Sequence, residues 1–597
     1  MTISKLIKIV FLLTALMCSI TLVQGQSSLI KGHVYQEIDT NCQKDFWETT
    51  TLSNVIIKAE KGSWVNYTTT DVSGYYELPV DTGTYYVSMI PPSPYWLACN
   101  DSAIVSFSTA GTTTHNLGSW AYTCPLLHVG VSTPVLQPCQ PSTYTVSYCN
   151  IGTGNAAGAY VDVQLDSFLT LDSASAPLLG QLGYKLYRFD VGNVPFNTCG
   201  NFDVHTTLDC GTILTGQTHC VSAHIFPDTL CIPGTNAIWD QSDIKITVEC
   251  NIDSIKFHLE NIGTGNMSTQ RAYFVAEDEI MLKTGTYQLN SGQIETLAVP
   301  VNGLTYHMQA QQDPAHPLRP FVSVGFEGCG AVADTTGILL QYPLENYLPA
   351  FDYDCQQNLS QLPETSTTGY PIGYGSNHYI PSTQPLEYHI QFQNRGLGIS
   401  NNVLIVDTLS EHLDISSLQI MSCSHDYTWT LEDNVLKIQF NNILLPTYTI
   451  DNHKSQGFAR FYILQKPGNI DGTIIENNAQ VYFDGQGQTT NTTTHEIKGD
   501  AYTSIITHTV FEKTIEQASI QIFPNPVHRQ ATVRIEPKEP ANSILFRLWN
   551  SQGQLVYSKA SQTSQFEIYP NSLTSGVYFY TIEIDGKPAQ TGQLIAK

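Results

Sequence analysis

Five oxygen-bearing side chains near the N-terminus are the residues in this sequence best suited to chemistry. They are Asp39, Asn41, Gln43, Asp45 and Glu48. Calcium takes six to eight oxygen ligands, and oxygen side chains at alternating positions followed by a glutamate are suited to wrap such an ion. The segment predicts a structural calcium site, with a solvated turn as the alternative. We expect no cofactor to be required.

The cysteines form the second candidate set. There are fourteen, and eight of them lie between Cys124 and Cys250. No C-x2-C pair suggests zinc, so disulfides are expected if the protein is exported, although eight cysteines allow 105 connectivities. Spacings of 10 to 11 residues, as between Cys139 and Cys149, suit staples between strands. Cys42 and Cys99 are the only cysteines of residues 26–120, so we predict that they pair.

Catalytic motifs are missing from the sequence. There is no G-x-S-x-G elbow, H-E-x-x-H helix or glycine-rich phosphate loop. The pairs His219/His224 and His412/His425 have no accompanying ligand set. We therefore expect no enzymatic activity and no catalytic residues; a cryptic hydrolase with paired carboxylates stays open.

The N-terminus indicates export. Residues 1–25 combine Lys5 and Lys8, an apolar stretch from Ile9 to Val23, and a small-residue cleavage site at Gly25, as in a signal peptide. Acylation at Cys18 is a weaker alternative, because Met17 stands where a small residue is needed. No later stretch is apolar over the roughly 18 residues of a membrane span, so the sequence predicts no transmembrane segment.

Composition narrows the fold and the partners. The 597 residues carry a formal charge of −25, which becomes −27 without the leader, yet only 13% are charged. Polarity from Thr, Ser, Asn, Gln and Tyr favours strands and turns over helices. An acidic surface repels phosphate backbones and anionic lipids. The expected class is an all-β extracellular protein that binds no nucleic acid, and a glycan or protein ligand is possible.

Three segments share one pattern, an alternating strand followed by an Asn-x-Gly-x-Gly turn. The asparagines are Asn150, Asn261 and Asn394, separated by 111 and 133 residues, which is the size of an immunoglobulin-like sandwich. We place three such domains in tandem at 121–242, 243–350 and 351–500. Each turn is either a ligand loop or a hairpin corner in which glycine supplies positive φ, and we favour the corner.

Aromatic residues on the strands of the N-terminal region suggest a carbohydrate platform, unless alternate members belong to the core. They are Trp64, Tyr67, Tyr75, Tyr76, Tyr85, Tyr95 and Trp96.

Residues 26–120 contain Thr69 to Tyr75, a T-T-D-x-x-G-Y motif, between an early G-x-V strand and a later G-T-Y-x-V strand. This region resembles the carboxypeptidase-regulatory-like and B-type surface modules, which implies a transthyretin-type sandwich. The acidic segment described above resembles the calcium loop of the B-type modules, but it lacks the loop glycine and carries Gln43 in place of an aspartate.

The C-terminus carries a series of motifs in order. Phe523 leads into a P-N-P entry, a hairpin follows, and a G-x-Y strand precedes the basic end. Residues 515–597 resemble the type A sorting domain of type IX secretion in the Bacteroidota, and 501–514 read as a linker. The resemblance implies that secretion machinery is a partner and that the protein is secreted or displayed on the outer cell surface. The matching residues are Pro524, Asn525, Pro526, Gly553, Gly576 and Tyr578.

The preceding region carries Asp354-Cys355-Gln356, Gly373-Tyr374-Gly375 and, near its end, Val481-Tyr482-Phe483-Asp484. With these residues, the segment from about Asp352 to Thr494 resembles a domain of unknown function that often precedes this sorting domain. The sequence as a whole predicts a non-catalytic exported protein, either adhesin-like or a presentation stalk. A carbohydrate-binding surface protein is the alternative.

Overall fold

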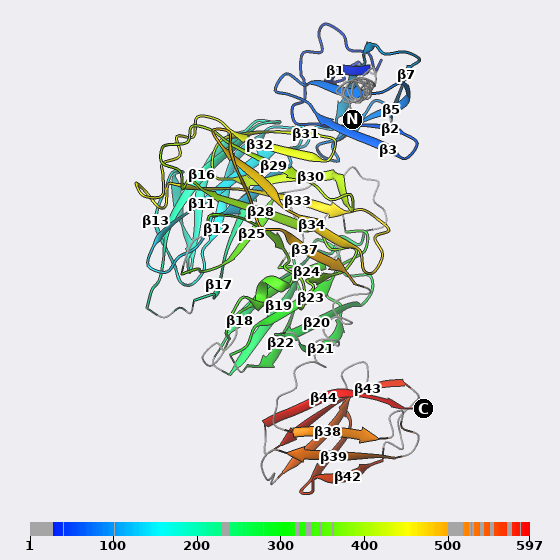
Figure 1. Cartoon of the computed structure of the whole chain (residues 1–597), viewed down its shortest axis with the longest axis vertical. Coiled ribbons are helices and arrows are strands. Elements are labelled where there is room, and N and C mark those ends of the chain that lie inside the picture. The colour runs from blue at the N-terminus through cyan, green and yellow to red at the C-terminus, as the bar shows by residue number, and fades with distance from the viewer. Residues whose placement is uncertain are drawn as a thin grey trace, which may run out of the picture. The chain divides into compact units, whose positions relative to one another are not determined.

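The computed structural model describes two stretches of the chain, and almost every regular element in them is a β-strand (Figure 1). The signal peptide and the linker lie outside the described residues. The fold class expected from composition, an all-β array of sandwiches, is confirmed. The described residues are 28–498 and 518–596, without 40, 101, 212, 214, 229–230, 232–238, 252, 279, 302, 317–320, 330–335, 345–348, 361–362, 524–526, 528–529, 538–542, 550–554, 570–575 and 585–586.

The chain divides into two compact units, of which the first holds the residues up to 123 together with 429–436. Its N-terminal module is a two-sheet sandwich whose inward-facing residues, such as Val34, Ile57 and Tyr85, are fully buried. One sheet has the order β4-β1-β9-β6, with β8 also pairing β1, and the other has the order β3-β2-β5-β7. The strands are β1 (Ser28–Gln36), β2 (Ile56–Lys61), β3 (Trp64–Thr69), β4 (Tyr75–Val80), β5 (Gly83–Ile90), β6 (Trp96–Ala98), β7 (Ala103–Phe107), β8 (Thr112–Thr114) and β9 (Leu117–Ala121).

The second unit begins with a sandwich that we call the first sandwich. Its sheets have the orders β10-β11-β16-β13 and β14-β15-β12-β17-β25. The strands are β10 (Leu127–Ser132), β11 (Pro141–Asn150), β12 (Ala156–Gln164), β13 (Leu169–Ala174), β14 (Leu178–Gly183), β15 (Leu186–Val194), β16 (Cys199–Leu208), β17 (Thr218–Phe226) and β25 (Phe351–Gln357).

The last strand of the first sandwich, β25, comes from beyond the next domain along the chain. It pairs antiparallel with β17, with Cys220 opposite Cys355. The expected boundary between residues 350 and 351 is therefore displaced, because residues 351–357 complete the first sandwich. The second sandwich is inserted between two neighbouring strands of one sheet.

The second sandwich has sheets of order β18-β19-β22 and β21-β20-β23-β24 around a core that includes Phe257 and Tyr306. Its strands are β18 (Ile244–Cys250), β19 (Ser254–Asn261), β20 (Arg271–Glu277), β21 (Ile280–Tyr287), β22 (Ile294–Pro300), β23 (Tyr306–Gln311) and β24 (Phe321–Phe326), and the short 3-10 helix η1 (Ile338–Gln341) follows.

The third sandwich occupies residues 365–497. Its sheets have the orders β26-β28-β33-β30, β27-β37-β34 and β31-β32-β29-β35-β36. The strands are β26 (Thr365–Tyr370), β27 (Tyr379–Ile380), β28 (Leu386–Gln393), β29 (Val403–Thr408), β30 (Leu413–Cys423), β31 (Tyr427–Glu432), β32 (Val435–Phe440), β33 (Gln456–Gln465), β34 (Ile474–Asn477), β35 (Ala479–Phe483), β36 (Gln486–Thr489) and β37 (Thr493–Ile497).

The C-terminal module is a small sandwich with sheets of order β38-β39-β42 and β41-β40-β43-β44 around buried Phe546 and Leu548. The strands are β38 (Ala518–Phe523), β39 (Ala531–Pro537), β40 (Ile544–Trp549), β41 (Leu555–Ser561), β42 (Gln565–Ile568), β43 (Gly576–Ile584) and β44 (Lys587–Ala596).

The asparagines of the three similar turns are buried and make equivalent hydrogen bonds. Each Nδ2 donates to the carbonyl four residues on, at 2.8–2.9 Å, and to the carbonyl of a residue farther along the chain, at 2.9–3.2 Å. Each Oδ1 accepts from the amide two residues on, at 3.0–3.1 Å. The side chain thereby closes its own turn and ties it to another loop, which is the role of a structural corner. The residues are Asn150, Asn261 and Asn394.

The expectation that the glycines of these three turns supply a positive φ is wrong. None of the six has a positive φ. A Cβ on Gly152 would lie 2.3 Å from the amide nitrogen of Leu126, and one on Gly263 would lie 2.3 Å from the carbonyl oxygen of Gln241. In these two turns, glycine is needed because another segment passes against the backbone.

Six disulfides join twelve of the cysteines, and none links two cysteines that are 10 to 11 residues apart. The pairing of 10-to-11-residue neighbours suggested by spacing is therefore wrong, because that spacing spans a single strand: Cys139 lies just before β11, and Cys149 lies near its end. Cys423 is free and buried. The bridges are Cys42–Cys99, Cys124–Cys231, Cys139–Cys210, Cys149–Cys199, Cys220–Cys355 and Cys250–Cys329.

The first and third sandwiches pack closely through β10 and β30. A Cβ on Gly130 of β10 would lie 2.2 Å from the carbonyl oxygen of Met421 on β30. The buried guanidinium of Arg460 on β33 crosses the same joint and donates to the carbonyl of Val131 at 2.9 Å. Close backbone approach and a shared buried ion group fix these two sandwiches against each other.

Candidate functional site

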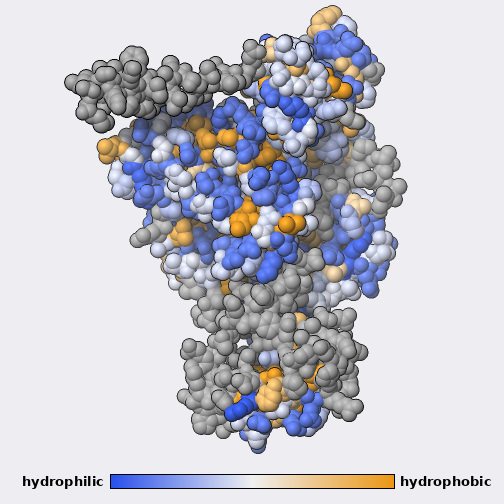
Figure 2. Space-filling model, turned by 45° about the vertical axis from the view of Figure 1, so that its right-hand side comes forward, coloured by the Kyte–Doolittle hydropathy of each residue, from blue (hydrophilic) through white to orange (hydrophobic). Residues whose placement is uncertain are grey.

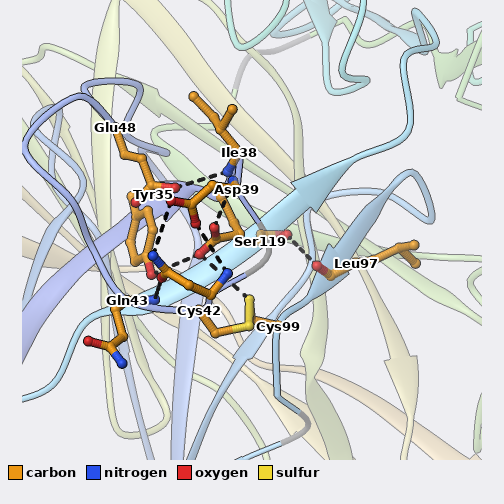
Figure 3. The surroundings of a disulfide bond; sticks show 11 residues. Tyr35, Ile38, Asp39, Cys42, Gln43, Glu48, Leu97, Cys99 and Ser119 are labelled. Atoms are coloured by element: carbon orange, nitrogen blue, oxygen red, sulfur yellow. Dashed lines mark hydrogen bonds between the residues drawn. A yellow bond between two sulfur atoms is a disulfide. The ribbon is translucent and has the colours of Figure 1, made fainter.

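The candidate site is the loop that follows β1 in the N-terminal module. β1 ends at Gln36, and the loop doubles back so that Glu48 reaches the start of the loop. The Cys42–Cys99 disulfide, with a Cα–Cα distance of 5.7 Å, ties the loop to the end of β6 (Figure 3). A short covalent tie of this kind holds an otherwise irregular segment in one conformation.

Three carboxylates meet in this loop. Glu37, Asp39 and Glu48 each place an oxygen within 4.8 Å of the others. Glu37 and Glu48 are buried, whereas Asp39 is exposed. Buried carboxylates are costly unless they are paired or bind a cation. This donor set fits a hard divalent cation, which prefers oxygen ligands.

Backbone amides hold the two buried carboxylates in place. Glu48 accepts from the amides of Ile38 and Asp45, both at 2.9 Å. Glu37 accepts from the amide of Asp39 at 3.1 Å and from the hydroxyl of Tyr35 at 3.3 Å. Hydrogen bonds from the backbone and from Tyr35 thus help to position the two carboxylates.

The five predicted ligands are only partly brought together. The Asn41 amide group donates to Asp39 at 3.1 Å and to Asp45 at 2.8 Å, so it bridges two of them. Gln43 uses its backbone amide to bond Asn41, and its side chain points away from the group (Figure 3). The predicted set is therefore corrected at Gln43.

Glu37 is the residue that the sequence pattern missed. It stands two positions before Asp39, so it continues the alternation that selected the other ligands. It immediately follows a strand with an alternating apolar pattern, and the alternation of oxygen-bearing side chains is the signal that identifies it. Its position at the end of β1 turns the carboxylate into the loop.

The electrostatics of the loop reflect this crowding. Burial, followed by its contacts with Asp39 and Glu48, raises the pKa of Glu37 above its usual value. Burial, followed by the charges of Glu37 and Glu48, raises the pKa of the Tyr35 hydroxyl. The ammonium group of Lys44 lies in the same loop. Its Nζ donates to the Glu48 carbonyl at 2.8 Å and lies 5.5 Å from the centre of the Tyr35 ring.

The proposed aromatic platform is mostly core. Tyr76, Tyr85, Tyr95 and Trp96 are at most 3% exposed, so these four are corrected from candidate ligand residues to packing residues. Trp64 is 38% exposed, and Tyr67 and Tyr75 are half-buried. Strand alternation explains the division, because every second side chain faces the other sheet.

Most of the sorting motif lies outside the described residues. This holds for Pro524, Asn525, Pro526 and Gly553. Gly576 begins β43, and Tyr578 on the same strand is buried in the core of the C-terminal module. In the described part, the motif therefore supports packing.

The histidine pairs have structural surroundings. His219 is fully buried, with Nδ1 3.1 Å from Asp166 Oδ1 and Nε2 3.0 Å from the Asn358 amide nitrogen. Its pair member His224 instead contacts Asp228 at 3.0 Å. Both ring nitrogens of His219 are occupied within the sandwich.

The fold and the loop define an all-β, disulfide-bonded multidomain protein with a cluster of three carboxylates in its first module. Two protein families match segments in the C-terminal half of the chain. Residues 371–496, most of the third sandwich, match a domain of unknown function, DUF7619. Residues 521–597 match the secretion system C-terminal sorting domain. Both C-terminal resemblances drawn from the sequence are confirmed, and the sorting domain implies export by type IX secretion.

The resemblance of the N-terminal module to the carboxypeptidase-regulatory-like modules stays a prediction. No curated protein matches the chain. Within the residues described, no helix has the length and apolarity needed to cross a membrane.

Similar solved structures are distant. A DUF3823 family protein from Parabacteroides merdae is 12% identical, covers 34% of this chain and 92% of its own, and has a TM-score of 0.15. The collagen-binding domain of a Staphylococcus aureus adhesin is 12% identical over 24% of this chain and 100% of its own, with a TM-score of 0.16. A putative membrane anchored protein from Corynebacterium diphtheriae is 8% identical over 75% and 97%, with a TM-score of 0.16. Scores this low carry no argument about function.

Proposed function

We propose that this protein is a non-catalytic surface or secreted protein whose sandwiches present a binding surface outside the cell. The observation that carries the proposal is the sorting-domain match at 521–597, on a module that folds as its own sandwich. Six disulfides support an oxidising destination. An adhesin or a presentation stalk fits this construction. A leader at residues 1–25 supplies the first export step.

Deletion of Phe523 to Lys597 tests the export step. The truncated chain should stay in the periplasm, whereas the full chain reaches the surface or the medium, as measured by protease accessibility on intact cells. A chain with Tyr569→Phe, which alters an exposed ring of the same module, serves as the control for unimpaired delivery. Surface delivery of the truncated chain would overturn the proposal.

A carbohydrate-binding surface protein is the second candidate, and the exposed indole of Trp64 favours it, because sugar rings stack on such side chains. Trp64→Ala should reduce retention of the purified chain on a glycan array. Trp120→Ala removes an indole of similar exposure from β9 of the same module and is the matched control. Equal retention by the two variants would count against a role for Trp64.

A structural calcium ion is the third element of the proposal, supported by the three carboxylates of the loop. Terbium, a luminescent substitute for calcium, should be sensitised by the nearby indole of Trp47, and calcium should quench the signal by competition. Glu37→Gln should weaken this binding, and Glu77→Gln, which alters an exposed carboxylate of the same module, should not. Terbium luminescence that is identical in both variants would remove Glu37 from the site.

A further inference from the structure

A groove between the first and third sandwiches stands apart from the loop site. Its volume is about 390 Å³, within the range of small-molecule sites. One wall comes from β11 and β16, and the other comes from the segments around β30 and the loop before β33. Both walls belong to the second unit and are fixed by the close packing of β10 on β30.

The first wall is a two-by-two grid of polar side chains. Thr143 stands opposite His205 and Thr145 opposite Asp203 in the register of β11 and β16. The Thr143 hydroxyl lies 3.0 Å from His205 Nδ1, and the Thr145 hydroxyl donates to Asp203 at 3.2 Å. Cross-strand partners project from the same face of a sheet, so these groups face the groove together, already oriented.

The second wall adds further polar groups and an apolar rim. The Ser424 hydroxyl lies 2.8 Å from His425 Nδ1, and Leu444 is 61% exposed beside Pro446. His453 Nε2 approaches Gln140 Oε1 of the first sandwich at 3.3 Å. A second bridge runs from the Asn201 amide to Asp426 at 3.2 Å. Hydrogen bonds therefore span the two walls at two places.

The charges in the groove are balanced, because Asp203 and Lys454 are the only carboxylate and ammonium groups among its lining residues. Hydroxyl and imidazole groups both donate and accept hydrogen bonds. On the face of the molecule that Figure 2 shows, hydrophobic residues lie in separate patches among polar ones.

We propose that this groove binds a short neutral oligosaccharide. Sugar hydroxyls match the hydroxyl, imidazole and carboxylate groups of the grid, and the C–H face of a sugar ring matches Leu444 and Pro446. Asp203 and Lys454 balance each other's charge, so an uncharged ligand is the one that the groove favours. The proposal rests on the protein's being a surface binder, and it assigns the ligand class to a site distinct from Trp64.

The test uses the purified mature chain and a defined panel of probes: maltotriose, cellotriose, diacetylchitobiose, N-acetyllactosamine, one sulfated disaccharide and one proline-rich peptide. Titration calorimetry should show binding of at least one neutral sugar. His205→Ala should weaken it about tenfold, as expected for one lost hydrogen bond in a site excluded from water. Ser424→Ala on the other wall should also weaken it.

The matched control is His258→Ala. His258 lies opposite Thr296 in the second sandwich and makes the same cross-strand contact, 2.8 Å from the threonine hydroxyl, outside the groove. The affinity of the His258→Ala variant for the sugar should equal that of the unaltered chain. No binding of any neutral sugar, equal affinity of His205→Ala, or binding of the peptide or sulfated sugar alone would overturn the proposal. Export is measured separately on cells, so a failure of the proposed export is distinguishable from a failure of sugar binding.

Discussion

Arg460 on β33 holds both carboxylate oxygens of Asp352 on β25, with Nη1 2.7 Å from Oδ2 and Nη2 3.0 Å from Oδ1. Both side chains are buried. The same guanidinium donates through Nε to Glu387 on β28 at 2.8 Å and through Nη2 to the carbonyl of Tyr353 at 2.8 Å. One cation therefore joins strands of the first and third sandwiches, which are distant in sequence.

Replacing Arg460 by Met should loosen this joint. Asp352 and Glu387 would remain with no cation, and removing one partner of a buried ion pair costs about 3–5 kcal/mol. Hydrogen exchange of the β25 amides should accelerate accordingly. Arg395→Met, which breaks an exposed pair with Glu364, should leave β25 unchanged. Equal exchange in the two variants would contradict a locking role.

Acid should weaken the same joint through His128 and His389. Burial, followed by the charge of Arg460, lowers their pKa values to about 4 and about 3. Their neutral forms favour the folded state, so this stability is complete above the unfolded pKa, near 6.5, and is lost as pH falls toward the folded values. Thermal unfolding should shift downward from pH 7 to pH 4. The double variant His128→Gln/His389→Gln should flatten that slope, and an unchanged slope would refute the assignment.

The buried corner asparagines should each be needed by their own sandwich. Asn150→Asp would place a carboxylate oxygen against the carbonyls of Gly154 and Val194, where an amide now donates. We expect a loss of about 2–4 kcal/mol, because donors are removed and buried acceptors are left unpaired. Hydrogen exchange in β11 and β12 should report it. Asn193→Asp, at an exposed position on β15 of the same sandwich, is the control, and an equal effect there would argue against the corner.

The Cys220–Cys355 bridge should stabilise more than the Cys149–Cys199 bridge. It closes a separation of 135 residues rather than 50, and the loop-entropy relation assigns it an advantage of about 1 kcal/mol. Two double variants, Cys220→Ala/Cys355→Ala and Cys149→Ala/Cys199→Ala, test this order. Hydrogen exchange in β17 and in β16 measures how much stability each variant loses. The reverse order would show that loop length does not govern these bridges.

The N-terminal module should lose stability as pH rises if no cation is present. The folded pKa of Glu37 lies above its unfolded value because of burial, so its contribution is complete below the unfolded pKa, near 4.5, and is lost as pH rises through the folded pKa. Added calcium should remove this dependence by neutralising the carboxylates. Glu37→Gln should also remove it. Melting curves that slope equally in the variant and the unaltered chain would exclude Glu37 as the cause.

The sequence by itself determined the fold class, the C-terminal sorting domain and the acidic loop. These rest on local signals: strand alternation, turn residues and motifs held within short segments. The corner asparagines were visible for the same reason, since each turn lies within a few residues of its strand.

Only the tertiary structure decided which distant segments meet. The pairing of β25 with β17 inserts one sandwich into another, and nothing near Cys220 indicates a partner at Cys355. The joint at Arg460 and the groove at His205 arise where two domains pack. The meeting of Glu37 with Glu48 depends on how the loop folds back. Side chains from separated segments are brought together by long-range packing, and a linear pattern does not encode that geometry.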